Sequence, residues 1–309
     1  MGSSNYSRDA YSHISANLKG KTVDQTFTQQ AAKKIHNSMS PVGVAFRESR
    51  DSANHPESLA VMVWLDGTGS MGEIPRVLVS EKLDKIMGTL IDHEIKDSSV
   101  FFGVIGDVKC DEFPLQVGQF ESGADELVKC LTTSYLEGGG GGNGGESYSL
   151  AHYFGGKHTS IDCFEKRQQK GFLFTIGDEP NHSRINKDEF RKVFESGEFE
   201  NMSDTECLDM AQRLYHVFHI HINHSSDPSY DSQPVSYWKK LLGERLIIAE
   251  NYNNVAEIIA STIAAIHGID LESVLKSFDA GTAADVRTAL APVNLSMAKN
   301  DAHGGVVTL

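Results

Sequence analysis

Three oxygen-bearing side chains stand at alternate positions directly after an apolar run. They are Asp66, Thr68 and Ser70, separated by Gly67 and Gly69. Carboxylate and hydroxyl oxygens are the hard ligands that Mg²⁺ and Mn²⁺ prefer, and the glycines allow the backbone to turn sharply between them. The segment therefore predicts part of a divalent-cation site. The alternative is a plain helix N-cap, in which Ser70 accepts hydrogen bonds from free backbone N–H groups.

Two later segments carry further candidate ligands. A glycine-rich stretch, residues 138–145, contains Asn143 and is followed by Glu146 and Ser147. Asp178 follows the apolar run 171–176. Asn143, Glu146 and Asp178 complete the predicted ligand set of Asp66, Thr68 and Ser70. The alternatives are a flexible linker for the glycine-rich stretch and a simple turn cap for Asp178.

Alternating strands and helices are predicted to position these residues. Residues 59–65 form a continuous apolar run, LAVMVWL, which is typical of a strand buried on both faces. Apolar runs predict further strands at 100–105, 171–176, 217–222 and 246–249, with a shorter edge strand at 115–120, and helical periodicity predicts helices over 83–90, 124–131 and 255–266. This pattern predicts an α/β fold with a doubly wound, mostly parallel central sheet and helices on both faces. Ligands of such folds bind at the carboxyl ends of the strands.

The two ends of the chain differ from this central part. We expect an N-terminal extension over residues 1–57, a domain over 58–267 and a C-terminal extension over 268–309. Residues 26–36 are expected to form a helix, and 271–278 another. Five apolar residues are expected to anchor the N-terminal extension on the domain: Tyr11, Ile14, Leu18, Val23 and Phe27.

Composition restricts the classes of partner. The 42 acidic residues outnumber the 28 basic ones and give a formal charge of −14, which argues against nucleic acid as a partner. No stretch approaches the roughly 18 apolar residues of a membrane helix. The four cysteines form no CxxC pair and are interpreted as free thiols in a reducing compartment. We therefore expect a cytoplasmic protein with neither a nucleic-acid nor a membrane partner.

The candidate residues resemble the metal-ion-dependent adhesion site (MIDAS) of the von Willebrand factor A (vWA) family, over residues 58–267. That site carries D-x-S-x-S after the first strand, and Asp66, Thr68 and Ser70 match it with Thr in place of the first Ser. Met71 is similar to the bacterial form of the motif. Asp178 matches the family's Asp after the fourth strand. Gly144 stands where the second loop usually supplies a Thr, so that Asn143 or Glu146 would substitute for it.

The resemblance implies a Rossmann-like vWA fold and a function in protein–protein interaction. In that interpretation Mg²⁺ or Mn²⁺, held weakly because of Gly144, bridges to a carboxylate of a partner. Intracellular bacterial and phage members suggest a MoxR-type AAA+ ATPase or a larger assembly as the partner. The chain is interpreted as a binding module without catalytic residues, and not as an enzyme.

Two other interpretations involve different chemistry. Asp66-Gly67-Thr68 is similar to part of the first motif of haloacid-dehalogenase-type hydrolases, but Trp64 occupies the position of their nucleophile. A metal-assisted phosphoester hydrolase of this or another α/β type, with His182 or Glu179 as the base, is therefore the alternative function. The G-x-G-x-x-G spacing from Gly67 to Gly72 could indicate a dinucleotide site, although Asp66 would repel a pyrophosphate. The pair His219 and His221 is interpreted as structural, since no further ligand accompanies it.

Overall fold

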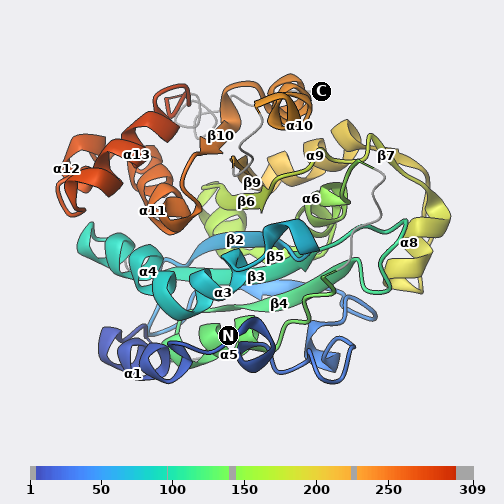
Figure 1. Cartoon of the computed structure of the whole chain (residues 1–309), viewed down its shortest axis with the longest axis horizontal. Coiled ribbons are helices and arrows are strands. Elements are labelled where there is room, and N and C mark those ends of the chain that lie inside the picture. Colours follow the sequence, from blue (N-terminus) through green and yellow to red (C-terminus); the bar gives the residue numbers. More distant parts are fainter. Residues whose placement is uncertain (1–4, 96, 139–143, 224–227, 297–309) are drawn as a thin grey trace.

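The computed structural model describes residues 5–95, 97–138, 144–223 and 228–296. A six-stranded sheet with the order β10-β9-β6-β2-β3-β4 forms the centre of the molecule (Figure 1). All neighbouring strands pair in parallel except β4, which is antiparallel to β3 at one edge. The strands of this sheet are β2 (Leu59–Asp66), β3 (Ser98–Ile105), β4 (Leu115–Glu121), β6 (Gly171–Gly177), β9 (Tyr215–Ile222) and β10 (Leu246–Ala249). The predicted fold class is confirmed.

Helices cover both faces of this sheet (Figure 1). One layer comprises α1 (Arg8–Leu18), α3 (Ile74–Val77), the π-helical turn η3 (Leu78–Lys82), α4 (Leu83–Asp92), α5 (Ala124–Thr132), α11 (Val255–Ile266) and α13 (Ala280–Leu290). The opposite layer comprises α6 (Tyr148–Lys157), α7 (Asp162–Arg167), α8 (Lys187–Phe194), α9 (Asp204–Leu214) and α10 (Pro228–Leu242).

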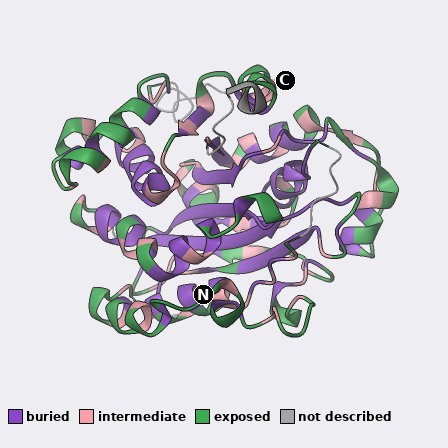
Figure 2. Ribbon diagram, viewed as in Figure 1, coloured by how far each residue is buried: buried purple, intermediate pink, exposed green. Residues whose placement is uncertain are grey.

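Strand β2 explains how one sequence supports two cores. All eight of its residues are buried. Successive side chains of a strand point to opposite faces, so Val61 and Val63 belong to one apolar cluster and Met62 and Trp64 to the other. Figure 2 shows the same distribution, with buried residues along the central strands and exposed residues on the outer sides of the helices. A continuous apolar run is therefore what this position in the sheet requires.

The strand order reverses direction at β2. From β2 the chain proceeds outward through β3 and β4, and the later strands β6, β9 and β10 lie on the other side of β2. The gap between the carboxyl ends of β2 and β6 is consequently a topological switch point, where open α/β sheets bind ligands. Asp66 ends β2, and Asp178 directly follows β6. The topology alone brings these two carboxylates to the same crevice.

Described segments before residue 58 and after residue 267 pack against the same core. Tyr11, Leu18 and Phe27 are buried in the apolar cluster that includes α4 and α5, and β1 (Arg47–Ser49) pairs in parallel with β5 (Thr159–Ile161). Beyond α11, α12 (Leu271–Leu275) and α13 add buried side chains to the same cluster. The remaining elements are short: α2 (Val23–Thr26), η1 (Asn37–Met39), η2 (Gly69–Met71), β7 (Arg184–Ile185), β8 (Met202–Ser203), η4 (Gly243–Arg245) and η5 (Tyr252–Asn254).

The helix expected over residues 26–36 is wrong. Helix α2 ends at Thr26, turns follow it, and Lys33 adopts a left-handed backbone with φ 49°. This stretch lacks an apolar stripe whose burial would offset the cost of helix formation, and short helices gain most of their stability from such packing. Among the described residues, no helix has both the length and the apolar character needed to cross a bilayer.

Candidate metal site

The turn after β2 is organised by the Asp66 carboxylate. Asp66 is fully buried, and its Oδ1 accepts hydrogen bonds from the Thr68 backbone N–H at 2.9 Å and from Thr68 Oγ1 at 2.6 Å. Gly67 is required here because a Cβ at this position would lie 2.5 Å from Cγ1 of Val104. The alternation of oxygen-bearing residues and glycine thus produces a tight turn that places Thr68 over the end of the strand.

Ser70 connects this turn to the end of β6. Its Oγ donates to Oδ1 of Asp178 at 2.9 Å, and Asp178 is fully buried. Ser70 lies in η2 and is exposed to solvent. The structure therefore brings together Asp66, Thr68, Ser70 and Asp178, with Ser70 at the solvent side of the cluster.

The two hydroxyl oxygens lie 3.2 Å apart. Each hydroxyl has one proton, and these protons already point at carboxylates, from Thr68 to Asp66 and from Ser70 to Asp178. The lone pairs of both oxygens consequently remain available next to two carboxylates. Such a donor set suits a hard divalent cation.

Tyr148 adds a contact that the sequence did not predict. Its hydroxyl donates to Oδ2 of Asp66 at 2.8 Å from the first residue of α6. The approach depends on Gly177, because a Cβ there would lie 1.8 Å from the Tyr148 hydroxyl oxygen and 2.9 Å from Oδ2 of Asp66. Tyr148 thus fixes the orientation of the Asp66 carboxylate. No local pattern around residue 148 identifies this role.

Glu146 is the described residue of the second loop that faces the site. The residue is 5% exposed, and its Oε2 is buried without a hydrogen-bond partner among the described residues. The backbone holds it in place, since Glu146 N donates to the carbonyl of Pro180 and the N–H of His182 donates to the carbonyl of Glu146. A buried carboxylate oxygen without a partner is costly unless it is protonated or binds a cation.

Burial and mutual repulsion dominate the electrostatics of the site. Burial raises the pKa of Asp66, and Asp178 raises it further, against the lowering effect of the hydrogen bonds from Thr68 and Tyr148. The pKa of Glu146 is raised by burial first and then by the charges of Asp66 and Asp107. A bound cation would reverse both effects, because an opposite charge favours the ionised carboxylate.

The remaining predicted ligand is outside the described part. Asn143 lies among residues 139–143, which are not described. Gly144 has a left-handed backbone with φ 72°, and a Cβ at this position would meet no atom within 4 Å. Among the described residues, no group of three His, Cys, Asp or Glu side chains is close enough to share a metal ion. The ligand set that fits a cation is therefore two carboxylates and two hydroxyls, with Glu146 beside them.

A second polar network lies next to this site, after β3. Asp107 is 1% exposed at its side chain, and its Oδ1 lies 2.8 Å from Nε2 of His182. Nζ of Lys109 lies 3.1 Å from the other ring nitrogen, Nδ1. A lysine ammonium can only donate, so Nδ1 accepts from Lys109 and the Nε2–H donates to Asp107. His182 thus connects Lys109 to Asp107 through its two ring nitrogens, and sequence patterns did not predict this arrangement.

Other residues considered from the sequence serve the core. His219 is fully buried, stacks on Trp238 at a centroid distance of 3.7 Å and lies 2.8 Å from the Thr175 hydroxyl through Nδ1. Burial is the main cause of its pKa being well below the usual range. Trp64, at the position where a hydrolase of the alternative type needs its nucleophile, packs against Phe101 and Phe154.

Comparison with known proteins gives distant likeness only. No protein-family profile matches the chain, and no curated protein matches it. The pilus adhesin SpaC of Lactobacillus rhamnosus GG, in an open conformation, matches with 9% identity and a TM-score of 0.42, over 66% of this chain and 30% of the adhesin. Proximal thread matrix protein 1 of the mussel byssus matches with 8% identity and a TM-score of 0.41, over 66% of this chain and 47% of that protein.

A second structure of the byssus protein has a zinc-occupied MIDAS motif. It matches with 10% identity and a TM-score of 0.33, over 66% of this chain and 46% of that protein. In each of these comparisons the match spans less than half of the other chain. Any functional conclusion therefore rests on the geometry of this chain's own site.

Proposed function

We propose that this chain is a vWA-like module that binds a divalent cation, Mg²⁺ or Mn²⁺, and uses it to bind a partner protein. The observation that supports this most is the hydrogen-bonded series Asp66–Thr68–Ser70–Asp178 at the switch point of the sheet. Two carboxylates neutralise the ion, and two hydroxyl oxygens complete its protein ligands. A bound cation supplies one open coordination position with positive charge.

The open position would accept a carboxylate from the partner. Ser70 is exposed whereas Asp66 and Asp178 are fully buried, so a partner would approach from the Ser70 side. Tyr148 and Thr68 hold the Asp66 carboxylate, which limits its rearrangement when the ion binds. A charge-assisted contact of this kind is specific and is abolished by a chelator. A MoxR-type ATPase or a larger assembly remains the predicted class of partner.

Thermal denaturation with and without Mg²⁺ or Mn²⁺ tests the cation site. A ligand that binds only the folded protein stabilises it by about 2.7 kcal/mol at a concentration of 100 Kd. We expect a rise in Tm with wild type that is absent in Asp66→Ala and reduced in Ser70→Ala. Asp188→Ala is the matched control, because Asp188 is an exposed carboxylate on α8 that pairs with Arg191. An equal metal response in Asp66→Ala would place the ion elsewhere.

The interaction is tested separately from the ion. The purified protein is added to cell extract as bait, with Mg²⁺ or with EDTA, and then cross-linked. The wild-type protein should capture a partner in Mg²⁺ and not in EDTA, and Asp66→Ala should capture it in neither. A partner retained by Asp66→Ala in EDTA would show that binding does not use the cation. Absence of phosphoester turnover in Mg²⁺ is expected as well, and turnover that depends on Asp66 would favour the hydrolase interpretation instead.

A further inference from the structure

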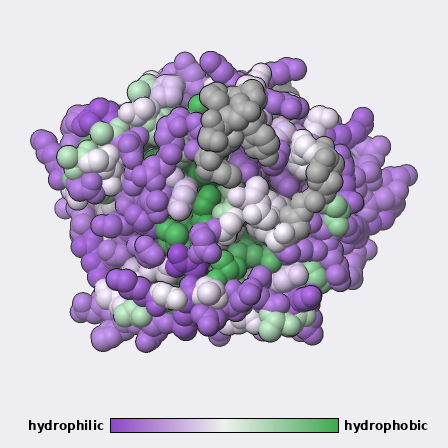
Figure 3. Space-filling model, in the orientation of Figure 1, coloured by the Kyte–Doolittle hydropathy of each residue, from purple (hydrophilic) through white to green (hydrophobic). Residues whose placement is uncertain are grey.

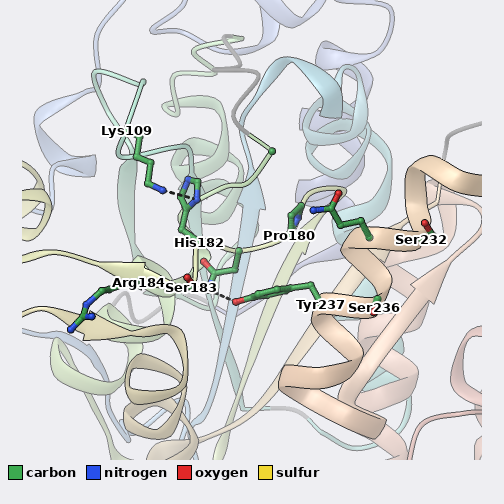
Figure 4. Close-up of a pocket in the computed structure, with 11 residues that line it drawn as sticks. Lys109, Pro180, His182, Ser183, Arg184, Ser232, Ser236 and Tyr237 are labelled. Atoms are coloured by element: carbon green, nitrogen blue, oxygen red, sulfur yellow. Dashed lines mark hydrogen bonds between the residues drawn. The ribbon is translucent and has the colours of Figure 1, made fainter.

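A cavity lies beside the candidate metal site, and the charged side chains among its lining residues are basic. Its volume is about 700 Å³, and Lys109, His182 and Arg184 contribute to its lining (Figure 4). None of the described residues that line it is Asp or Glu. In a chain with a formal charge of −14, a cavity lined by two cations and no carboxylate is an unusual local environment.

The two sites share one segment of backbone. Residues 180–182 pair with Glu146, which faces Asp66, while the His182 side chain faces the cavity. Figure 4 shows Lys109 reaching His182 from the loop after β3, and Tyr237 and Ser236 entering from α10. The cavity is thus formed by elements distant in sequence that meet at the carboxyl edge of the sheet.

Lys109 is a positioned cation within this cavity. One of its N–H groups donates to His182, whose other ring nitrogen is held by the buried Asp107 carboxylate. An ammonium has three donors, so two remain for a ligand. Arg184, on β7, is exposed and has no carboxylate of a described residue within ion-pair distance, although its charge lowers the pKa of the Glu206 carboxyl.

Hydroxyl and amide groups supply further donors. Ser183, Ser236 and Gln233 are among the residues that line the cavity, and their side chains carry hydroxyl and amide groups. The Tyr237 hydroxyl is already committed, because it donates to Asp204 and accepts from Asn181. Two cations and several neutral donors fit an anion with a charge of about −1.5 to −2 and three terminal oxygens, which is the chemistry of a phosphate monoester.

We propose that this cavity is a binding site for a phosphate monoester, distinct from the cation site. A lone carboxylate would satisfy only one of the two cations. The volume lies within the range of small-molecule sites, about 300 to 1,000 Å³, and leaves room for the substituent of the ester. The site does not depend on the cation proposal, since none of the predicted metal ligands Asp66, Thr68, Ser70 and Asp178 lines it.

Calorimetric titration with O-phospho-L-serine tests the proposal, in EDTA and at constant ionic strength set with chloride. Wild type should bind it saturably, with Kd in the millimolar range or below. Lys109→Gln should raise Kd about ten-fold or more, because a charge-assisted contact is lost, and Arg184→Gln should raise it by a smaller factor. Arg213→Gln is the matched control, since Arg213 is exposed on α9 and does not line the cavity; its Kd should equal that of wild type.

Three results would overturn the proposal. L-glutamate binding as tightly as phosphoserine would show a general carboxylate site, and inorganic phosphate binding without phosphoserine would exclude the ester. Binding that requires Mg²⁺ and disappears in Asp66→Ala would place the phosphate on the cation instead. Because Lys109→Gln removes the contact with His182, the Tm of this variant is also measured without ligand. Arg184→Gln changes an exposed side chain and therefore gives an independent test.

Discussion

Two carboxylates at opposite ends of β2 have opposite surroundings. Asp51 lies at the amino end, where it accepts hydrogen bonds from the backbone N–H and the hydroxyl of Ser58, the residue before the strand. Asp66 ends the same strand. Both carboxylates accept several hydrogen bonds, but only Asp51 is surrounded by cations.

At the amino end of β2, basic side chains neutralise the Asp51 carboxylate. Asp51 forms ion pairs with Lys166 at 3.2 Å and Arg167 at 2.9 Å. Burial alone would raise the pKa of Asp51, but the hydrogen bonds from Arg167, Ser58 and Lys166 hold it well below its usual range. Arg50 extends this network through its ion pair with the buried Asp162. The charges at this end are satisfied within the chain.

At the carboxyl end of β2, several acidic side chains lie close together. Asp66 forms no ion pair with any described residue, and its neighbours Asp178 and Glu146 are also acidic. A fold that maximised stability would not bury such a group, because repulsion and desolvation both oppose it. The contrast supports the proposal that the carboxyl end of β2 binds a cation from outside the chain, whereas the charges at its amino end are balanced within the chain.

Of the substitutions proposed here, Gly177→Ala should lower the free energy of unfolding most. The new Cβ would displace the Tyr148 hydroxyl from Asp66, and overpacking of this kind in a buried strand costs about 3 kcal/mol. We expect a lower midpoint in urea and a weaker metal response. Gly281→Ala on α13 is the control, since its Cβ would meet only the Asp279 side chain at 3.3 Å. Equal stability of the two variants would show that β6 and α6 can move apart freely.

Asp51→Asn should destabilise the protein by about 2 kcal/mol, since Arg167 and Lys166 lose a charged partner in a half-buried setting. Urea unfolding measures this change. The metal response should remain that of wild type, because Asp51 is at the other end of the strand. Loss of the metal response in this variant would contradict the separation of the two ends.

The affinity of the site for the cation should increase with pH. Because the pKa of Asp66 is raised, the metal-free folded protein keeps this proton to a higher pH than the unfolded chain does, and the stability that this contributes is lost as the pH rises through the folded pKa. A cation competes with that proton, so its Kd should fall by up to about ten-fold per pH unit below the folded pKa. Titrations with Mn²⁺ at pH 5.5, 6.5 and 7.5 measure this. A Kd that does not change with pH would show that Asp66 is already ionised.

Asp66→Asn should have the smallest effect and the opposite sign to Asp51→Asn. At a pH above the raised pKa of Asp66, where the metal-free carboxylate is ionised, the change removes repulsion from Asp178 and Glu146, and we expect it to raise the free energy of unfolding by about 1 kcal/mol. The measurement is urea unfolding in EDTA, with both asparagine variants in parallel. A decrease similar to that of Asp51→Asn would mean that the two carboxylates are equally satisfied.

The strands and the position of Asp66 and Asp178 at one edge of the sheet were predictable from sequence. Continuous apolar runs such as 59–65 are a local property, and the rule for parallel strands then places Asp66 and Asp178 at one edge. The contact of Tyr148 with Asp66 and the connection from Lys109 through His182 to Asp107 were not predictable. They depend on how α6 and residues 180–182 pack, and no local pattern encodes that packing.

Helix α13 shows a second limit. Its sequence, AGTAADVRTAL, has few large apolar residues, so no helix was predicted beyond residue 278. Its start is nevertheless defined by Asp279, which accepts hydrogen bonds from the N–H groups of Gly281 and Thr282. Val286 and Leu290 then bury its inner face against α11. Small residues permit close packing of two helices, which a hydrophobicity pattern does not detect.

The two edges of the sheet bear on how this protein can assemble with others. An open edge strand offers unpaired backbone groups on which another chain can add a strand. Here η1 and β1 lie against β4, and α10 and α13 lie against β10. The face in Figure 3 is mostly hydrophilic, with an apolar strip near its centre. Strand addition at β4 would first have to displace residues 37–49, so removal of the N-terminal segment should convert a protein protected from edge-to-edge aggregation into one prone to it.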